Sequence, residues 1–374
     1  MNGNIKMKNR LASKWLKGGL PLLPRLSFEE HYDSPMCVST INEKVRYAVL
    51  KELDSDSNNP VFLEDFIKNN GEDEVIAQVD RYGMPYNTVV SKDTGIVRVS
   101  PYYSEEWIKR FYNKYYRPLY TNDKEFSKMD VFQDQINRGN YYFNFMENIV
   151  DVSSSILEIG CGMGGILFPF KMRGFKVKGI DYGEDFVEKG KEVGLDLTNE
   201  EVDDLINNNV KFDLIILSHL LEHIVDLNVF LSKIHKLLTD KGKLFIAVPG
   251  IKNIHKAYKK DLLSYLQNAH AWHFSQNTLK AALIFNGFSI LKSDEEINCL
   301  AQKEKEEDAS IETINELLKF EYDNVTKYLL ETEEHFHKKT TSKFNNSIKK
   351  SFLDLSLREF WGVKLLIKIK NKIK

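Results

Sequence analysis

The chain has 374 residues, of which 42% are hydrophobic and 28% charged, so its composition is that of a globular protein and not of a disordered one. Its 52 Lys and Arg residues and 54 Asp and Glu residues leave a net charge of −2, which removes the electrostatic argument for a nucleic-acid-binding protein. The three cysteines, Cys37, Cys161 and Cys299, lie far apart and make neither a disulfide framework nor a metal cluster. We therefore expect a reducing, cytoplasmic location and no nucleic acid among the partners.

The first 150 residues divide into regions of different composition. Residues 1–35 are basic and contain Gly and Pro, which predicts an irregular arm. Over 36–100, short runs of β-branched residues separated by Gly, Asn and Asp predict small strands and hairpins and no helices. Over 101–150, aromatic residues recur three or four positions apart, which predicts helices. Eight of the 17 tyrosines fall between Tyr102 and Tyr142.

From residue 151 onward, short apolar strands alternate with helices of about 10–15 residues. This alternation predicts right-handed βαβ units and a parallel sheet that is covered on both faces. Two further strand-like runs within 288–303 are expected to close the sheet as an antiparallel pair. The predicted fold class is therefore α/β: a doubly wound, mostly parallel, Rossmann-like sheet of seven strands over 151–302, followed by a helical extension over 303–374.

A glycine-rich turn follows the first strand of this predicted sheet. Gly160, Gly162 and Gly164 let the backbone approach a ligand closely, because no Cβ intervenes and φ can be positive. The turn lies where open α/β sheets bind nucleotides, and Asp181 ends the second strand, where an acid can accept both ribose hydroxyls. The spacing differs from the dinucleotide fingerprint and lacks the Gly-Lys-Ser/Thr of a phosphate loop. The turn and the acid together indicate a cofactor site.

Four motifs in this order resemble those of class I S-adenosylmethionine-dependent methyltransferases: the loop E-x-G-x-G-x-G, the acid after strand two, the fourth-strand segment FDLIILSHLLEH and the fifth-strand segment DKGKLFIAVPG. The resemblance covers about residues 153–300 and implies S-adenosyl-L-methionine as the cofactor. It implies that Asp181 holds the ribose and that Tyr182 flanks the adenine. Glu201, or in competition Asp203, would accept from the adenine amino group. The implied cofactor-binding set is Glu158, Gly160, Cys161, Gly162, Gly164, Asp181, Tyr182, Glu201 and Ser218.

Histidines supply the candidates for catalysis. Methyl transfer to a hydroxyl needs an aligned acceptor and a base that removes its proton, and histidine suits that role. His219 and His223 lie in SHLLEH, and His270 and His273 lie in NAHAWHFS. An H-x-x-x-H pair can bind a metal, but the sequence shows no third ligand, so we expect none. Packing under the loop is the alternative role for His223, and we expect His273 to anchor the core.

The segment NAHAWHFS resembles one found in sugar-modifying methyltransferases, and in deoxysugar C-methyltransferases its first histidine is the base. This resemblance implies His270 as the base, assisted by His219 or His223, with a hydrogen-bonded structural role as the alternative. Ala269 stands where those enzymes carry a glutamate, which favours O-methylation over C-methylation. The implied acceptor is a hydroxyl of a sugar, nucleotide-sugar or surface-glycan intermediate. Two alternatives stay open: a quinone or other lipid-linked acceptor, and a cofactor-binding scaffold without catalysis.

Sugar methyltransferases of this type often carry a zinc ribbon with two C-x-x-C knuckles before the catalytic domain. The corresponding segments here are Cys37–Thr40 and Ser91–Thr94, which keep one thiolate of four, so we expect no zinc. The tyrosine-rich helices fit either a lid over the acceptor or an aromatic seam between domains. The basic stretch WGVKLLIKIKNKIK fits a docked terminal helix or a weak peripheral contact with the inner face of an anionic membrane.

Overall fold

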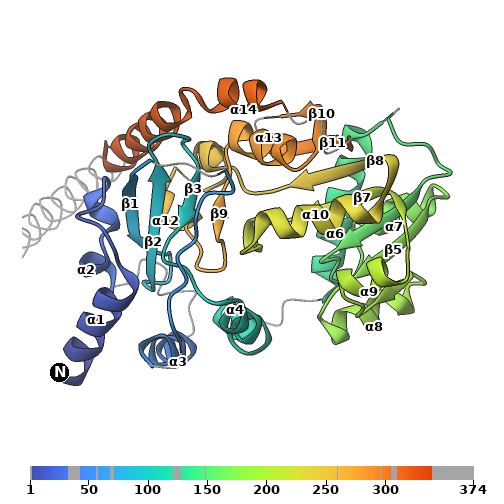
Figure 1. The fold of residues 1–374 in the computed structure, drawn as a ribbon. Helices are drawn as coiled ribbons and strands as arrows, with labels where there is room; N and C mark the ends of the chain where they lie inside the picture. The colour runs from blue at the N-terminus through green and yellow to red at the C-terminus, as the bar shows by residue number, and fades with distance from the viewer. Residues whose placement is uncertain are drawn as a thin grey trace, which may run out of the picture.

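Two β-sheets organise the protein in the computed structural model (Figure 1). A seven-stranded sheet carries the central part of the chain, and a four-stranded sheet lies beside the N-terminal helices. In Figure 1, α13 (Gln276–Phe285) and α14 (Ile311–Leu318) run along the upper side of the molecule. The structure describes residues 2–32, 43–55, 58–67, 71–120, 128–147, 149–258, 260–294, 296–304 and 310–338.

The seven-stranded sheet has the order β10-β11-β8-β7-β4-β5-β6, and this confirms the predicted doubly wound α/β fold. All neighbours from β8 to β6 are parallel, whereas β10 and β11 form the predicted antiparallel pair at the edge. The strand order reverses at β4, which is where open sheets of this kind bind ligands. The strands are β4 (Ser155–Ile159), β5 (Lys176–Ile180), β6 (Leu197–Thr198), β7 (Phe212–Ser218), β8 (Leu238–Ala247), β10 (Phe288–Ser293) and β11 (Asn298–Lys303).

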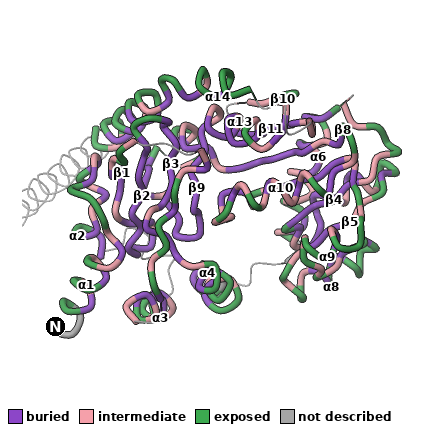
Figure 2. Tube along the Cα trace, in the orientation of Figure 1, coloured by how far each residue is buried: buried purple, intermediate pink, exposed green. Residues whose placement is uncertain are grey.

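The central strands are buried on both faces, as Figure 2 shows by their colour. Successive side chains of a strand point to opposite faces, so β7 divides its apolar residues between two cores. Leu214 and Ile216 join one cluster, and Ile215 and Leu217 join the other. A continuous apolar run is therefore the right sequence for this strand. The helices on the two faces are α6 (Lys128–Phe145), α7 (Leu167–Met172), α8 (Glu184–Glu192), α9 (Val202–Asn207), α10 (Leu227–Leu237) and α13.

The smaller sheet draws its strands from two distant parts of the chain. It has the order β1-β2-β3-β9, all antiparallel, with β1 (Asp73–Val79), β2 (Pro85–Ser91) and β3 (Val97–Val99) from the N-terminal region. Its fourth strand, β9 (Trp272–His273), belongs to the predicted catalytic region and pairs with β3. The segment NAHAWHFS thus completes the N-terminal sheet, and a single apolar cluster runs through both regions.

The N-terminal arm is helical, so the expectation of an irregular arm is wrong. Helix α1 (Asn2–Trp15) buries Met7, Leu11 and Trp15, which recur every fourth position and so line one helix face. The indole Nε1 of Trp15 donates to the carbonyl oxygen of Leu53 at 3.0 Å, which fastens α1 to α3. Helix α3 (Glu43–Asp54) also lies in a region for which strands alone were expected. Two shorter elements follow α1, the 3-10 turn Pro24–Leu26 and α2 (Phe28–His31).

The tyrosine-rich region is helical, and much of its aromatic surface is buried. It comprises α4 (Glu105–Phe111), a π-helical turn (Tyr112–Tyr116) and α5 (Arg117–Tyr120), with α6 following. The ring centroids of Tyr103 and Trp107 lie 4.4 Å apart, and those of Trp107 and Phe111 lie 5.1 Å apart. Tyr103, Trp107 and Phe111 are all buried, which is the packing of an aromatic seam.

The described C-terminal part is helical, with α14 followed by a helix over 321–338. The basic stretch WGVKLLIKIKNKIK and the knuckle residue Cys37 lie outside the described residues. Within the described part of the chain, no helix combines the length and the apolar character that crossing a membrane requires.

A buried ion network holds the hairpin at the second expected knuckle. The Nη1 of Arg98 lies 2.6 Å from Asp65 Oδ1, and its Nη2 lies 2.8 Å from Asp73 Oδ2. Arg98 Nε donates to the carbonyl oxygen of Leu63, and Thr94 Oγ1 donates to the other oxygen of Asp65. This network links the β2–β3 turn to the preceding loop with charge-assisted contacts.

Arg98→Met is expected to destabilise the fold by about 3–5 kcal/mol, because it leaves the buried carboxylate of Asp65 without its cation. The matched control is Lys92→Met, which removes an exposed pair with Glu72 and should cost less than about 1 kcal/mol. Urea unfolding followed by circular dichroism measures both. Equal losses in the two variants would contradict this account of the hairpin.

Candidate functional site

The glycine-rich loop lies at the carboxyl end of β4, at the point where the strand order reverses. Gly160, Gly162 and Gly164 have φ values of 74°, 55° and 72°, in the left-handed region that favours glycine. The backbone N–H groups of Gly160 and Cys161 both donate to the carbonyl oxygen of Ile180, at 2.9 and 3.2 Å. The end of β5 therefore fixes the loop in place.

Asp181 follows β5 and holds the same loop through its side chain. Its Oδ2 accepts from the backbone N–H of Gly162 at 2.8 Å, and its Oδ1 accepts from that of Gly183 at 2.7 Å. Each carboxylate oxygen has a further lone pair, so the group can also accept from a vicinal pair of hydroxyls. Its position and chemistry fit a ribose.

An exposed aromatic ring and an acid lie next to Asp181. Tyr182 is 69% exposed, and the Nζ of Lys109 from α4 lies 5.9 Å from its ring centroid and 3.7 Å from Glu201 Oε1. Asp203 instead pairs with Lys233 at 2.7 Å. Glu201 and Asp203 were the two candidates to bind the adenine amino group. Of these, Glu201 contacts Lys109, which also lies over the ring of Tyr182. These residues fit the adenosine half of S-adenosylmethionine.

Two of the expected cofactor residues, Cys161 and Glu158, have buried side chains. The Cys161 side chain is buried and packs against Gly179, and burial raises the pKa of its thiol well above the usual range. Glu158 is buried in β4, and desolvation raises the pKa of its carboxyl group well above its usual value. Ser218, at the end of β7, shares a hydrogen bond of 2.9 Å with the Tyr142 hydroxyl.

The segment after β7 brings the histidines to the glycine loop. His219 adopts a φ of 52°, which is unusual for a residue with a Cβ, and its backbone N–H donates to the carbonyl oxygen of Ala247 at 2.8 Å. The side chain of Leu220 lies 3.4 Å from where a Cβ on Gly160 would be. Direct contact therefore joins this segment to the cofactor loop.

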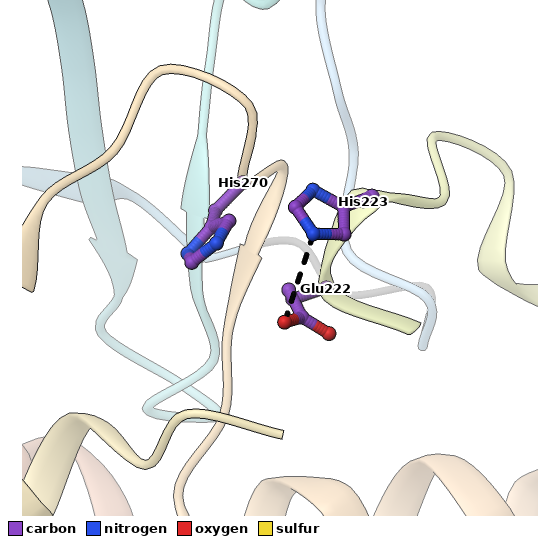
Figure 3. A group of neighbouring side chains, drawn as sticks. All are labelled: Glu222, His223 and His270. Atoms are coloured by element: carbon purple, nitrogen blue, oxygen red, sulfur yellow. Dashed lines mark ion pairs between the residues drawn. The ribbon is translucent and has the colours of Figure 1, made fainter. Parts of the chain in front are cut away.

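Glu222, His223 and His270 converge from two distant segments of the chain (Figure 3). One ligand atom from each lies within 4.8 Å of the others. Glu222 is 1% exposed, and neither of its carboxylate oxygens accepts a hydrogen bond from the described residues. Its Oε1 lies 3.6 Å from His219 Nδ1 and 3.7 Å from His223 Nε2. We name Glu222, His223 and His270 the EHH cluster.

Backbone contacts between distant segments position the EHH cluster. The N–H of Ala271 donates to the carbonyl oxygen of Glu222 at 2.8 Å, and His223 Nδ1 lies 2.9 Å from the carbonyl oxygen of Ala269. Because a carbonyl oxygen only accepts, this contact places a proton on His223 Nδ1. His223 Nε2 faces Glu222, 3.7 Å from its Oε1. Tyr112 from the aromatic region also reaches His223 Nδ1, at 2.7 Å.

Burial keeps two imidazoles of this region neutral. Desolvation, with the neighbouring His223 adding to it, lowers the pKa of His270 well below 6.5, and His270 Nδ1 has no hydrogen-bond partner among the described residues. Desolvation lowers the pKa of His273 to about 3. His273 Nε2 lies 3.0 Å from the Tyr86 hydroxyl, and this buried contact suits the expected role as a core anchor.

Glu222 and Tyr112 were not among the predicted site residues. Glu222 was visible in SHLLEH, but nothing in that segment shows that the loop of His270, 48 residues after Glu222, brings an imidazole to it. The reason for expecting no metal was the lack of a third ligand. The fold brings together a different trio, Glu222, His223 and His270, of which His219 is not a member.

Comparison with known families assigns the central region. The sequence model of a family described as "Methyltransferase domain" matches residues 134–293. This part of the chain is a methyltransferase domain. It is of the class I, S-adenosylmethionine-dependent type, and its strand order, its glycine loop and Asp181 agree with that class. The matched region covers the seven-stranded sheet as far as β10 and includes the EHH cluster.

Curated relatives match a shorter part. The ubiquinone biosynthesis O-methyltransferase of Bartonella tribocorum is 31% identical over 98 residues, which are 25% of this chain and 40% of that protein. The human mitochondrial ubiquinone biosynthesis O-methyltransferase is 27% identical over 152 residues, which are 36% of this chain and 41% of that protein. The chain thus spans about two fifths of the length of these relatives.

Solved structures with a similar fold include a magnesium protoporphyrin IX methyltransferase from Synechocystis with bound SAH. It is 16% identical, has a TM-score of 0.41 and covers 54% of this chain and 100% of that one. A SAM-dependent methyltransferase from Methanosarcina mazei is 19% identical, has a TM-score of 0.35 and covers 43% of this chain and 97% of that one.

Asp181→Asn is expected to weaken S-adenosylmethionine binding about 10–100-fold, because one acceptor oxygen becomes an amide that faces a backbone N–H or a ribose hydroxyl. Isothermal titration calorimetry on the full chain measures the dissociation constant. Asp203→Asn is the control and should change it less than about twofold. A larger effect at Asp203 than at Asp181 would overturn this assignment.

Stability is expected to depend on pH through His273. Its folded pKa of about 3 lies below the ordinary 6.5, so the unfolded chain binds the proton first and stability falls as pH drops below 6.5. His273→Gln cannot take up that proton. The wild-type minus variant difference in unfolding free energy should therefore fall by about 2–3 kcal/mol from pH 7 to pH 4.5. His255→Gln, at an exposed site, is the control, and a flat difference for His273→Gln would contradict the prediction.

Proposed function

We propose that the whole protein is an S-adenosylmethionine-dependent O-methyltransferase that acts on a hydroxyl of a small-molecule acceptor. The observation that carries this proposal is the contact between the two halves of the site. Leu220, two residues before Glu222, lies against Gly160 of the cofactor loop. The buried EHH cluster is therefore adjacent to the position at which a loop of this kind holds its cofactor.

Different residues of the chain bind the cofactor and act on the acceptor. Asp181, Tyr182 and Glu201 would hold the adenosine part, and the bound cofactor would supply a methyl group on a sulfonium. The acceptor hydroxyl would give its proton to a base of this chain as the methyl group passes from sulfur to oxygen, and the S–C electron pair would stay on sulfur. His270 is the proposed proton acceptor, because its burial keeps the ring neutral at physiological pH. His223 and His219 assist it from beside Glu222.

The comparisons favour a quinone precursor over the sugar that the histidine segment implied. The bacterial and human relatives named above are both ubiquinone biosynthesis O-methyltransferases, and neither name refers to a sugar. A phenolic hydroxyl has a pKa near 10, so a neutral imidazole removes its proton more readily than that of an alcohol. Tyr112 and Tyr116, with ring centroids 4.8 Å apart, add flat aromatic surface beside His223 that suits a planar ring. We therefore propose a phenolic acceptor.

A transfer assay on the full chain tests the function. Release of demethylated cofactor is measured with catechols and hydroxybenzoates on one side and with nucleotide-sugars on the other. Turnover on phenols alone supports the proposed acceptor, and turnover on sugars alone would replace it with a glycan intermediate. Cofactor binding without turnover on any acceptor would favour a non-catalytic scaffold.

His270→Asn is expected to lower kcat at least about 100-fold while the dissociation constant of S-adenosylmethionine changes less than about twofold, because His270 acts on the acceptor and not on the cofactor. The assay compares kcat by cofactor release and binding by calorimetry. His255→Asn, whose ring contacts Tyr328 away from the site, serves as the matched control. An unchanged kcat in His270→Asn would remove His270 from the mechanism.

A further inference from the structure

We propose that the EHH cluster is a binding site for one divalent transition-metal ion, of the kind that prefers imidazole ligands, with Zn²⁺ as the reference ion. Its role in acceptor chemistry rests on the proposed function, but its capacity to bind the ion does not. The ligand atoms come from Glu222 and His223, after β7, and from His270, in the loop before β9 (Figure 3).

The spacing of the polar atoms is that of ligands and not of hydrogen-bond partners. Glu222 Oε1 lies 3.6 Å from His219 Nδ1 and 3.7 Å from His223 Nε2, which exceeds a normal hydrogen bond. Two ligands that share a tetrahedral ion, each at about 2.1 Å, are separated by about 3.4 Å. Within the cluster, the Glu222–His223 separation of 3.7 Å is within a few tenths of an ångström of this value. The ligand atoms of all three residues lie within 4.8 Å of one another, so a bound ion would draw them closer together.

The charge of Glu222 points to a cation. The side chain is almost completely buried, and neither oxygen accepts a hydrogen bond from the described residues. Removing a carboxylate from water without a partner is costly, so buried carboxylates are paired or bind metals. The neighbours that face it are the imidazoles of His219 and His223, at 3.6 and 3.7 Å from Oε1. A divalent ion at the cluster would give this buried carboxylate a full positive partner.

His223 is oriented as a metal ligand is when a hydrogen bond holds its second ring nitrogen. Metal-binding histidines commonly donate their second ring N–H to a carbonyl oxygen, which fixes the tautomer. His223 Nδ1 makes this contact with the carbonyl oxygen of Ala269, and Tyr112 reaches the same atom. The Nε2 lone pair is thereby directed to Glu222 and the ion.

The ligand set also selects the ion and leaves room for the acceptor. Two imidazoles and one carboxylate favour zinc and its neighbours over Mg²⁺ and Ca²⁺, which prefer oxygen ligands. Three protein ligands leave a coordination position open, as in catalytic zinc sites. His219, with a side chain 45% exposed, lies 3.6 Å from Glu222 Oε1 at the edge of the cluster. An acceptor hydroxyl at the open position would be acidified by the ion, and its proton would pass to His219 in place of His270, which would then serve as a ligand.

The test is metal binding by the full chain after removal of metals with a chelator. Calorimetry with Zn²⁺ and visible absorption with Co²⁺ are expected to show one ion per chain. Glu222→Gln and His270→Asn should each weaken Zn²⁺ binding at least about 100-fold, and His235→Asn, an imidazole outside the cluster, should leave it unchanged. If Glu222→Gln does not fold, His223→Asn takes its place.

Affinity for S-adenosylmethionine, measured on every variant, separates this inference from the proposed function. Loss of Zn²⁺ binding with unchanged cofactor affinity supports the site. No stoichiometric binding by the wild-type chain, or binding that survives both Glu222→Gln and His270→Asn, overturns it. If metal-free protein still transfers methyl groups at the full rate, the proposed function stands and the metal's role in it falls. If the chain binds Zn²⁺ at the cluster but does not bind S-adenosylmethionine, the metal site is supported and the proposed function is refuted.

Discussion

The arrangement of the active region depends on the pairing of β9 with β3. This short strand pair ties the loop before it to the N-terminal sheet, and the hydrogen bond from Ala271 to the carbonyl of Glu222 ties the same loop to the segment after β7. His270 lies between these two attachments. Without them, its imidazole would have no reason to lie beside Glu222 and His223. The N-terminal sheet therefore helps to set the position of His270, a residue of the region that matches the methyltransferase model.

The cofactor half of the site depends on a second set of contacts. Asp181 accepts from the glycine loop, Ile180 accepts from the same loop, and Leu220 lies 3.4 Å from where a Cβ on Gly160 would be. These contacts place the loop, the acid and the segment after β7 within one rigid region at the reversal point of the sheet. Transfer of a methyl group depends on such alignment, since positioning supplies a large part of the rate.

Features set by local periodicity were predictable from the sequence, and features set by long-range pairing were not. The parallel sheet, its antiparallel edge, the glycine loop and Asp181 follow from apolar runs and residue spacing. The helix of residues 2–15 carried a readable signal, with Met7, Leu11 and Trp15 four positions apart, that the surrounding basic residues obscured. β9 has two residues and no periodicity of its own, so only the fold reveals it. The EHH cluster depends on that strand and was hidden for the same reason.

The central claim is that the glycine loop and the EHH cluster form one site with the cofactor between them. A crystal structure of the full chain with S-adenosylhomocysteine tests it most directly. The account predicts ribose hydroxyls within hydrogen-bond distance of Asp181, adenine beside Tyr182, and the thioether sulfur directed toward the EHH cluster. A ligand that binds elsewhere, or a sulfur that points away from His270 with protein density between them, would contradict it.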